Sequence, residues 1–264
     1  MIDFHNHVLP NVDDGSKSLE MSILMLRTAS EQGITDVVNT VHFQHPKVEL
    51  ENINFDRIKT EIRKLQNEID RQGIPIDIHI GSEVFYLPNL LKIKDNPLVT
   101  IGNGNYMLIE FHPHQIPETQ KQQLYELKLS GITPIIAHPE RYRQVQDNID
   151  LVAEWLEAGC IIQIDAGSPI GLLGNRAMKA SQKIIRNKWC QLVGSDAHDN
   201  KNRKFCLSES LKFINNFLGD DMIEWVTTNP RKILNGEKIQ VEIEYESKNS
   251  DGFISVIKHR LGLI

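Results

Sequence analysis

Short β-rich runs alternate with amphipathic segments along most of the chain, and this alternation restricts the fold more than any other feature. Apolar residues at spacings of three and four, the period of one helix face, predict helices at 55–71 and near 118–129, 149–158, 176–187 and 206–217. A first helix is predicted between an N-cap at Ser18 and a stop at Gly33. The β-rich runs fall at 2–5, 34–42, 76–83, 106–111, 132–138, 161–165 and 191–196. Repeated strand–helix units predict a parallel sheet, and seven strands in one chain favour a barrel.

The pattern changes after Gly236, which divides the chain into a barrel at 1–236 and a C-terminal appendage at 237–264. Alternating polar and apolar residues predict a short edge strand at 240–246. A loop at 247–252 and a small amphipathic helix at 253–263 are predicted to follow. The appendage is expected to pack on the barrel or on another subunit, with a flexible tail as the alternative.

Composition excludes several classes of protein. The net charge of −6 gives no reason to expect a general nucleic-acid or membrane surface. The N-terminus lacks a signal-peptide pattern, and no stretch approaches the ~20 apolar residues of a membrane span, so we expect a cytoplasmic protein without membrane insertion. The three cysteines are expected to be reduced and mostly buried. None has an Arg six residues downstream, which excludes a cysteine-nucleophile phosphatase loop; the cysteines are Cys160, Cys190 and Cys206.

Histidines and carboxylates follow six of the seven predicted strands. In parallel barrels the C-terminal strand ends form one rim, where active sites are built, so residues nearly 200 positions apart are expected to converge. The loop Asp13-Asp14-Gly15 reaches the same rim. The residues at the strand ends are His5, His7, His42, Glu83, Glu110, His138, Asp196 and His198.

Each of these features has a simpler interpretation when taken alone. An isolated His-x-His pair is more often structural than metal-binding, and Asp-Asp-Gly alone predicts a turn. Glu83 and Glu110 are harder to dismiss, because burying a carboxylate beside apolar strand residues is costly unless it is paired or metal-bound. Together, the six strand ends predict a metal site. Nitrogen and oxygen donors without a thiolate favour manganese, iron or zinc over soft metals.

The remaining histidines give weaker signals. His112 and His114 either line the rim or belong to an ordinary loop. His45, His79 and His259 are predicted to be structural or solvated.

Five motifs contain most of these candidate ligands, all except His42 and Glu110, and resemble, as an ordered set, the polymerase-and-histidinol-phosphatase (PHP) superfamily. Asp14, where many histidinol phosphatases carry His, makes the chain most similar to bacterial manganese-dependent protein-tyrosine phosphatases of capsule and exopolysaccharide operons. The resemblance covers residues 1 to about 236. The family usually shows Thr-Pro-His-His at the second strand end, whereas this chain has Thr40-Val41-His42-Phe43, a change that bears on substrate preference. The five motifs are Asp3-Phe4-His5-Asn6-His7, Asp13-Asp14-Gly15, Gly81-Ser82-Glu83, Ala137-His138-Pro139-Glu140-Arg141 and Gly194-Ser195-Asp196-Ala197-His198.

The resemblance implies a distorted seven-stranded (β/α)7 TIM-like barrel of the PHP type that holds three divalent metal ions. Manganese is the first expectation, with iron and zinc as alternatives. Glu83 is implied to bridge the first two ions. The implied ligand sets are His5, His7, Glu83 and Asp196 for the first ion, Glu83, Glu110 and His138 for the second, and Asp14, His42 and His198 for the third.

This set of ligands and metal ions suits the hydrolysis of phosphate esters. Four carboxylates against three divalent ions leave a formal charge of +2, which favours a phosphate dianion. We expect a metal-activated hydroxide to attack phosphorus in line. Arg141 and Arg203 are candidates to bind the phosphate and are grouped with Asp196 as catalytic residues. A surface ion pair is the alternative for each Arg.

The resemblance implies a protein-tyrosine phosphatase whose partner is a phosphotyrosine-bearing protein, such as the tail of a bacterial tyrosine kinase. Such an enzyme would regulate capsule or exopolysaccharide synthesis. One alternative is a phosphatase or phosphodiesterase acting on small molecules such as histidinol phosphate. A second, non-enzymatic alternative is a regulator that binds phosphotyrosine. The oligomeric state is left open.

Overall fold

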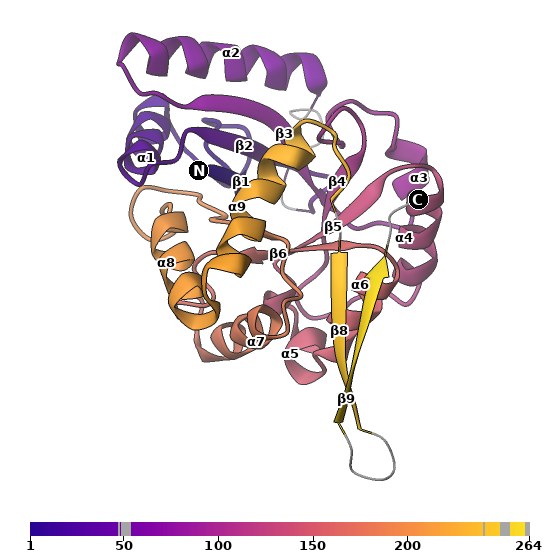
Figure 1. The fold of residues 1–264 in the computed structure, drawn as a ribbon. Helices are drawn as coiled ribbons and strands as arrows, with labels where there is room; N and C mark the ends of the chain where they lie inside the picture. The colour runs from indigo at the N-terminus through magenta and orange to yellow at the C-terminus, as the bar shows by residue number, and fades with distance from the viewer. Residues whose placement is uncertain (47, 49–53, 240, 249–253, 262–264) are drawn as a thin grey trace.

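Seven parallel strands form one sheet in the order β1 to β7 (Figure 1). The computed structural model describes residues 1–46, 48, 54–239, 241–248 and 254–261. Each strand up to β6 pairs with the strand that follows it in the sequence. Every connection between two consecutive strands contains at least one helix and returns the chain to the end of the sheet where the strands begin. The strands are β1 Ile2–Asn6, β2 Asp36–Phe43, β3 Asp77–Phe85, β4 Tyr106–Glu110, β5 Thr133–Ala137, β6 Ile161–Asp165 and β7 Leu192–Gly194.

The first and last strands meet at their C-terminal ends and close the sheet. The backbone N–H of His7 donates to the carbonyl of Ala197 at 2.8 Å, and the N–H of Asp196 donates to the carbonyl of His5 at 2.7 Å. These bonds lie just beyond β7, so closure occurs at the rim. The predicted seven-stranded (β/α)7 barrel is confirmed.

The two longest predicted helices of the N-terminal half begin and end as the sequence pattern indicates. In α1 (Leu19–Glu31) the side chain of Ser18 accepts from the backbone N–H of Met21 at 3.2 Å, and Gly33 follows the helix with φ +82°. In α2 (Phe55–Arg71) the buried residues are the predicted apolar face, Ile58, Ile62, Leu65 and Ile69. The other helices up to residue 218 are α3 Leu90–Ile93, α4 Gln120–Leu129, the 3-10 helix η2 Pro139–Arg141, α5 Arg143–Asp147, α6 Asp150–Glu157, α7 Asn175–Arg186 and α8 Leu207–Leu218.

A further helix, α9 (Asp220–Leu234), was not predicted from the sequence. The Asn229 side chain donates to the carbonyl of Gln191 at 3.1 Å, and Arg231 donates to the Asp36 carboxylate at 2.6 Å. Gln191 precedes β7 and Asp36 begins β2, so α9 lies at the N-terminal ends of the strands, opposite the rim (Figure 1). The Thr-Thr-Asn-Pro run inside the helix obscures its pattern, because these residues disfavour a helix interior.

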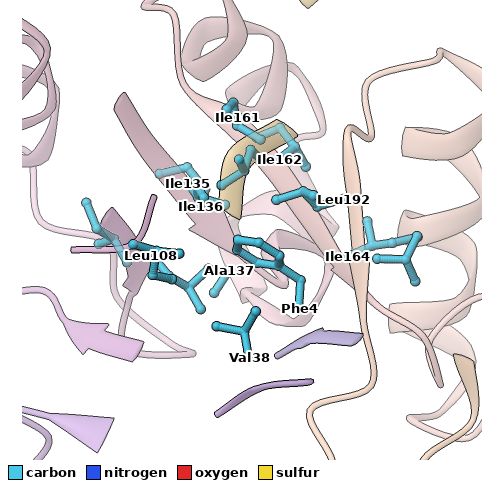
Figure 2. Close-up of a cluster of buried hydrophobic side chains, with 14 of the residues drawn as sticks. Phe4, Val38, Leu108, Ile135, Ile136, Ala137, Ile161, Ile162, Ile164 and Leu192 are labelled. Carbon is cyan, nitrogen blue, oxygen red and sulfur yellow. The ribbon is translucent and has the colours of Figure 1, made fainter. Parts of the chain in front are cut away.

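Strands β1, β2, β6 and β7 are buried along their whole length, as expected for parallel strands whose two faces are both covered. Phe4 is fully buried, and Figure 2 shows it among side chains of several other strands, including Val38, Ala137 and Leu192. Burying one side chain of this size stabilises the folded state by about 1.5–3 kcal/mol. This shared core holds the strand ends in fixed relative positions.

Gly194 allows β7 to approach β1 closely. A Cβ at this position would lie 2.5 Å from the His5 Cβ and 2.9 Å from the Gln163 Nε2. We expect Gly194→Ala to lower the free energy of unfolding by about 1–3 kcal/mol, because strands or side chains must move apart. Urea denaturation in the presence of a chelator checks this without a contribution from bound metal. An unchanged midpoint would contradict the close approach.

The C-terminal residues form an antiparallel hairpin of β8 (Val241–Lys248) and β9 (Ile254–Leu261). The predicted strand at 240–246 is present as β8, although Gln240 lies outside the described residues. The helix predicted at 253–263 is wrong: its described part is strand β9, whose pairing with β8 satisfies backbone groups and suits the β-branched Ile254, Val256 and Ile257. The hairpin passes α6 (Figure 1), while the domain boundary after 236 stays a prediction.

No helix in the described part of the chain combines the length and the apolar character needed to cross a membrane.

Candidate metal centre

The structure brings all nine predicted ligands to the C-terminal rim of the barrel. His42 and Glu83 are direct neighbours in the register of β2 and β3, so their side chains lie side by side. Asp14 is 43% exposed and marks the solvent side, whereas Glu110 is partly buried and the other seven are buried. Donor atoms within 4.8 Å of one another form groups that contain the three predicted sets, namely His5, His7, Glu83 and Asp196; Glu83, Glu110 and His138; and His7, Asp14, His42 and His198.

Four donor atoms of the first group lie close together. His5 Nε2 lies 3.2 Å from Glu83 Oε2 and 3.4 Å from Asp196 Oδ1. His7 Nε2 lies 3.4 Å from each of the same two oxygens. Two donors bound to one ion at about 2.1 Å lie about 3.0–3.4 Å apart, so these four separations suit a shared divalent transition metal ion. His5 Nε2, His7 Nε2 and Asp196 Oδ1 are buried without a hydrogen-bond partner among the described residues, so the arrangement fits a metal ion.

In three of the five candidate histidine ligands the other ring nitrogen is held by a hydrogen bond. His5 Nδ1 is 3.0 Å from the Gln163 side-chain oxygen, and His7 Nδ1 is 2.8 Å from Asp13 Oδ2. His198 Nδ1 is 2.8 Å from the backbone oxygen of Asp196. These acceptors keep the proton on Nδ1 and leave the Nε2 lone pair for a metal. Gln163 and Asp13 were not predicted, although Asp13 lies in a quoted motif.

The second group contains both oxygens of Glu83. Oε2 faces the first group, whereas Oε1 accepts a hydrogen bond from His138 Nε2 at 2.8 Å. His138 Nε2 also lies 4.0 Å from Glu110 Oε1. His138 has φ +32° and Asp196 has φ +46°, both in the left-handed region that non-glycine residues avoid. Such backbone conformations cluster at functional sites, because the surrounding structure must maintain them.

The third group opens to solvent through Asp14. Asp14 Oδ1 lies 3.1 Å from His42 Nε2 and 3.3 Å from His198 Nε2. The imidazole rings of His7 and His198 are 4.1 Å apart between centroids, which joins this group to the first. The three groups therefore form one continuous cluster.

Opposite charges maintain the ionised forms of Glu83 and His5, but not of Glu110. Burial alone would raise the pKa of Glu83, but His5 and His42 hold it well below its usual range. Burial would lower the pKa of His5, but Glu83 and Asp196 raise it to about 9. Burial, together with the charge of Glu83, raises the pKa of Glu110 to about 8. Protons on these side chains thus balance the carboxylate charge that bound cations would otherwise balance.

This electrostatic arrangement predicts pH-dependent metal binding. When the pH is below the His5 pKa of about 9, His5 holds a proton that an incoming ion must displace. We expect the apparent affinity for Mn²⁺ to rise from pH 6.5 to pH 9, by about tenfold per pH unit for each proton released. Titration calorimetry at pH 8 in buffers with different ionisation enthalpies measures the protons released. Identical heats in all buffers, with an affinity independent of pH, would contradict the prediction.

Two arginines lie beside the cluster. Arg141 Nη1 and Arg203 Nη2 both donate to Asp196 Oδ2, while Oδ1 of the same carboxylate faces His5 and His7. The two arginines are 31% and 35% exposed, so solvent and a ligand can reach them. The predicted alternative of an ion pair is thus present in the geometry, but its partner is a candidate metal ligand.

Arg141 is positioned by a buried acidic group. It belongs to η2, and its Nη1 lies 3.6 Å from Asp165 Oδ2 at the end of β6. Glu140 is fully buried and accepts from the backbone N–H of Asp165 at 2.9 Å and from the Ser168 hydroxyl at 2.7 Å. These bonds tie η2 to the loop after β6. The sequence motif contained Glu140, but no sequence signal pointed to Asp165.

The histidines outside the nine predicted ligands lie in different parts of the structure. His112 and His114 are exposed and lie in the loop after β4, outside the groups that could hold a metal in the described chain. His79 bonds Asp36 at 2.9 Å near the opposite end of the barrel, as expected for a structural residue. His45 lies close to two candidate ligands, His42 and Glu110, with one donor atom of each within 4.8 Å of the others, and its predicted structural role stays a prediction. The side chain of His259 lies outside the described residues.

The three cysteines are buried and unpaired with one another, as predicted. Burial raises the pKa of Cys160 and of Cys190 to about 12, which keeps both as unreactive thiols.

Comparisons with known proteins agree with this fold. CapC of Staphylococcus aureus is 32% identical over 258 residues, which is 96% of this chain and all of the relative. The tyrosine-protein phosphatase YwqE of Bacillus subtilis is 30% identical over 240 residues, covering 90% of this chain and 93% of the relative.

Solved structures show the same architecture. A chain from the crystal structures of YwqE from Bacillus subtilis and CpsB from Streptococcus pneumoniae, described as metal-dependent tyrosine phosphatases, superposes with a TM-score of 0.85 at 30% identity, covering 90% of this chain and 96% of that chain. The family model described as "Capsular polysaccharide synthesis, CpsB/CapC" matches residues 1–235. The chain therefore belongs to the CpsB/CapC family of capsular polysaccharide synthesis proteins.

Proposed function

We propose that the protein is a metal-dependent protein-tyrosine phosphatase. The observation that carries this proposal is the close set of donors from His5, His7, Glu83 and Asp196, beside which Arg141 and Arg203 lie at the solvent side. The proposal is supported by the names of relatives that span nearly the whole chain and are tyrosine-protein phosphatases.

Three divalent ions, with manganese first and iron or zinc as alternatives, are assigned to the three donor groups. Bound there, they would lower the pKa of a coordinated water and offset the charge of the phosphoryl oxygens. Glu83 would bridge two ions, since its oxygens face different groups. The ligands assigned to the ions are His5, His7, Glu83 and Asp196; Glu83, Glu110 and His138; and Asp14, His42 and His198.

The side chains around the ions account for substrate binding. Arg141 and Arg203 each use one N–H on Asp196, and a guanidinium has five N–H donors in a planar fork that matches phosphate oxygens. Asp196 would orient both arginines and one ion at once. A tyrosine leaving group, with a pKa of about 10, needs less protonation than an alkyl alcohol. The enzyme therefore needs no side chain dedicated to protonating the leaving tyrosine oxygen as a general acid.

The proposed partner is a phosphotyrosine-bearing protein, and the phosphorylated tail of a bacterial tyrosine kinase is the substrate we assign. Removal of phosphate from such a tail would regulate capsule or exopolysaccharide synthesis, in agreement with the family's description. This assignment requires a cytoplasmic location, which stays a prediction of the sequence.

The test compares substrates on the full chain loaded with Mn²⁺. We expect turnover of a phosphotyrosine peptide, with little turnover of histidinol phosphate or of a phosphodiester, and elemental analysis of the same sample should give three ions per chain. Preferential hydrolysis of histidinol phosphate would establish a small-molecule phosphatase instead. Tight phosphopeptide binding without turnover would establish a binding regulator.

Replacing Arg141 by Ala tests the phosphate-binding role. We expect kcat/KM for the phosphotyrosine peptide to fall by about 10–100-fold, the effect of losing one charge-assisted hydrogen bond. Arg176→Ala is a matched control, since Arg176 is an exposed arginine that pairs with Asp147 on the outer helices. Equal activity of the Arg141→Ala variant and this control would leave Arg141 as an ion-pair residue only.

A further inference from the structure

His45 lies against the candidate centre although it is outside the nine predicted ligands. Its imidazole stacks on that of His42 with 4.4 Å between ring centroids and 26° between planes. The ring of Phe85 meets it edge-on at 5.3 Å. The side chain is only 13% exposed, so its position is fixed from two sides by strands β2 and β3.

The backbone takes an unfavourable conformation to bring His45 there. β2 ends at Phe43, and Gln44 has φ +60°, which costs a non-glycine residue about 1–2 kcal/mol. The side-chain amides of Gln44 and Asn89 bond each other, with Asn89 Nδ2 donating to Gln44 Oε1 at 2.6 Å. This pair stabilises the reversal after β2 that allows the next side chain to meet His42. Backbone strain maintained beside a cluster of ligands indicates a functional constraint.

Three donor atoms converge at this place without bonding one another. Glu110 Oε2 lies 3.8 Å from His42 Nδ1 and 3.9 Å from His45 Nε2. Both separations are too long for hydrogen bonds, yet two bonds of about 2.1 Å to one ion would span the distance between Glu110 Oε2 and His45 Nε2. Glu110 Oε2 and His42 Nδ1 are buried and have no hydrogen-bond partner among the described residues. A carboxylate oxygen in that position is costly unless a cation neutralises it.

The two oxygens of Glu110 face different histidines. Oε1 is on the side of His138, at 4.0 Å from its Nε2, and Oε2 is on the side of His42 and His45. A neutral imidazole has one lone pair, and His42 Nε2 is 3.1 Å from Asp14, within the third group. The single lone pair of His42 is then used at Nε2, whereas His45 Nε2 lies 3.9 Å from Glu110 Oε2, where both atoms can bind one ion.

We propose that His45 is a tenth metal ligand, which binds through Nε2 the divalent ion held by Glu110. The inference deepens the proposed function, since it assumes that the cluster is loaded with divalent ions. A further imidazole favours transition-metal ions over Mg²⁺, which prefers oxygen ligands. His45 should therefore tighten Mn²⁺ binding at one position more than Mg²⁺ binding.

The experiment measures Mn²⁺ and Mg²⁺ binding to the full chain by competition with a chelator and by elemental analysis. His45→Ala removes the ring, and His45→Phe removes only the nitrogens while keeping an aromatic ring between His42 and Phe85. We expect both variants to bind the weakest Mn²⁺ at least about tenfold less tightly, or to lose it, with a smaller change for Mg²⁺. His114→Ala, an exposed histidine on the neighbouring loop, is the control and should bind like the unmodified protein.

Two outcomes overturn the inference. If His45→Phe binds Mn²⁺ like the unmodified protein, the ring serves packing alone, whatever His45→Ala does. If both variants lose Mg²⁺ and Mn²⁺ equally and their metal-free forms melt earlier, His45 stabilises the rim without binding an ion. Failure of the proposed function is a separate result, namely a chain that binds Mn²⁺ with the help of His45 but does not hydrolyse phosphotyrosine.

Discussion

Glu83→Ala is expected to abolish turnover, with kcat/KM falling by at least about 10³-fold, equivalent to about 4 kcal/mol of transition-state stabilisation. Glu83 Oε2 lies within 3.4 Å of the inward nitrogens of His5 and His7, and Oε1 bonds His138. Because the two oxygens face two donor groups, the variant should lose a shared ligand from two ions. Steady-state kinetics with a phosphotyrosine peptide, together with elemental analysis, measures both losses.

Two further variants separate charge from volume and from general destabilisation. Glu83→Gln keeps the size of the side chain but removes its charge, so it should be nearly as inactive as the Ala variant. Glu154→Ala changes an exposed glutamate that pairs with Lys121 on the outer helices, and it should be fully active. Near-normal activity of Glu83→Ala would refute the bridging assignment.

Removal of metal is expected to eliminate activity and to lower stability. Dialysis against a chelator should leave an inactive protein, and Mn²⁺ should restore turnover. Ligand binding stabilises the native state by about 2.7 kcal/mol when the free ion is at 100 times its dissociation constant, so the melting temperature should rise with added Mn²⁺. Activity assays and thermal melts across a Mn²⁺ titration test both effects.

Alkylation of thiols is the matched treatment and should have no rapid effect on the folded, loaded enzyme. The three cysteines are buried, and burial raises the pKa of Cys160 and Cys190 to about 12. Full activity in a protein shown to contain no metal would exclude the metal mechanism. Rapid inactivation by an alkylating reagent would point to a thiol nucleophile.

The sequence predicts the barrel and the rim because both follow from simple periodicities. Strand and helix patterns alternate in order, so the C-terminal strand ends must share one edge, and ligand-type residues at those ends must converge. The register of β2 and β3 shows the principle, since His42 and Glu83 come from separate motifs and are direct neighbours. Their role as ligands stays a prediction, as does that of the other seven.

The features that sequence reasoning missed depend on contacts between distant segments. Gln163 lies in the middle of β6 and has no motif, yet its side chain orients His5. His45 follows a residue with positive φ, and no pattern in the sequence predicts that reversal. The hairpin strand β9 was predicted to be helical because a short apolar segment suits both periods, and only pairing with β8 decides between them.

The meeting of β1 and β7 sets the order in which the protein can mature. His5 and His7 are synthesised nearly 200 residues before Asp196 and His198. A nascent chain that stops before β7 has three of the four donors for the first ion, lacks Asp196, and has two open strand edges. The full donor set therefore exists only after synthesis has passed β7, and a fully coordinated first ion would report that both ends of the barrel have joined.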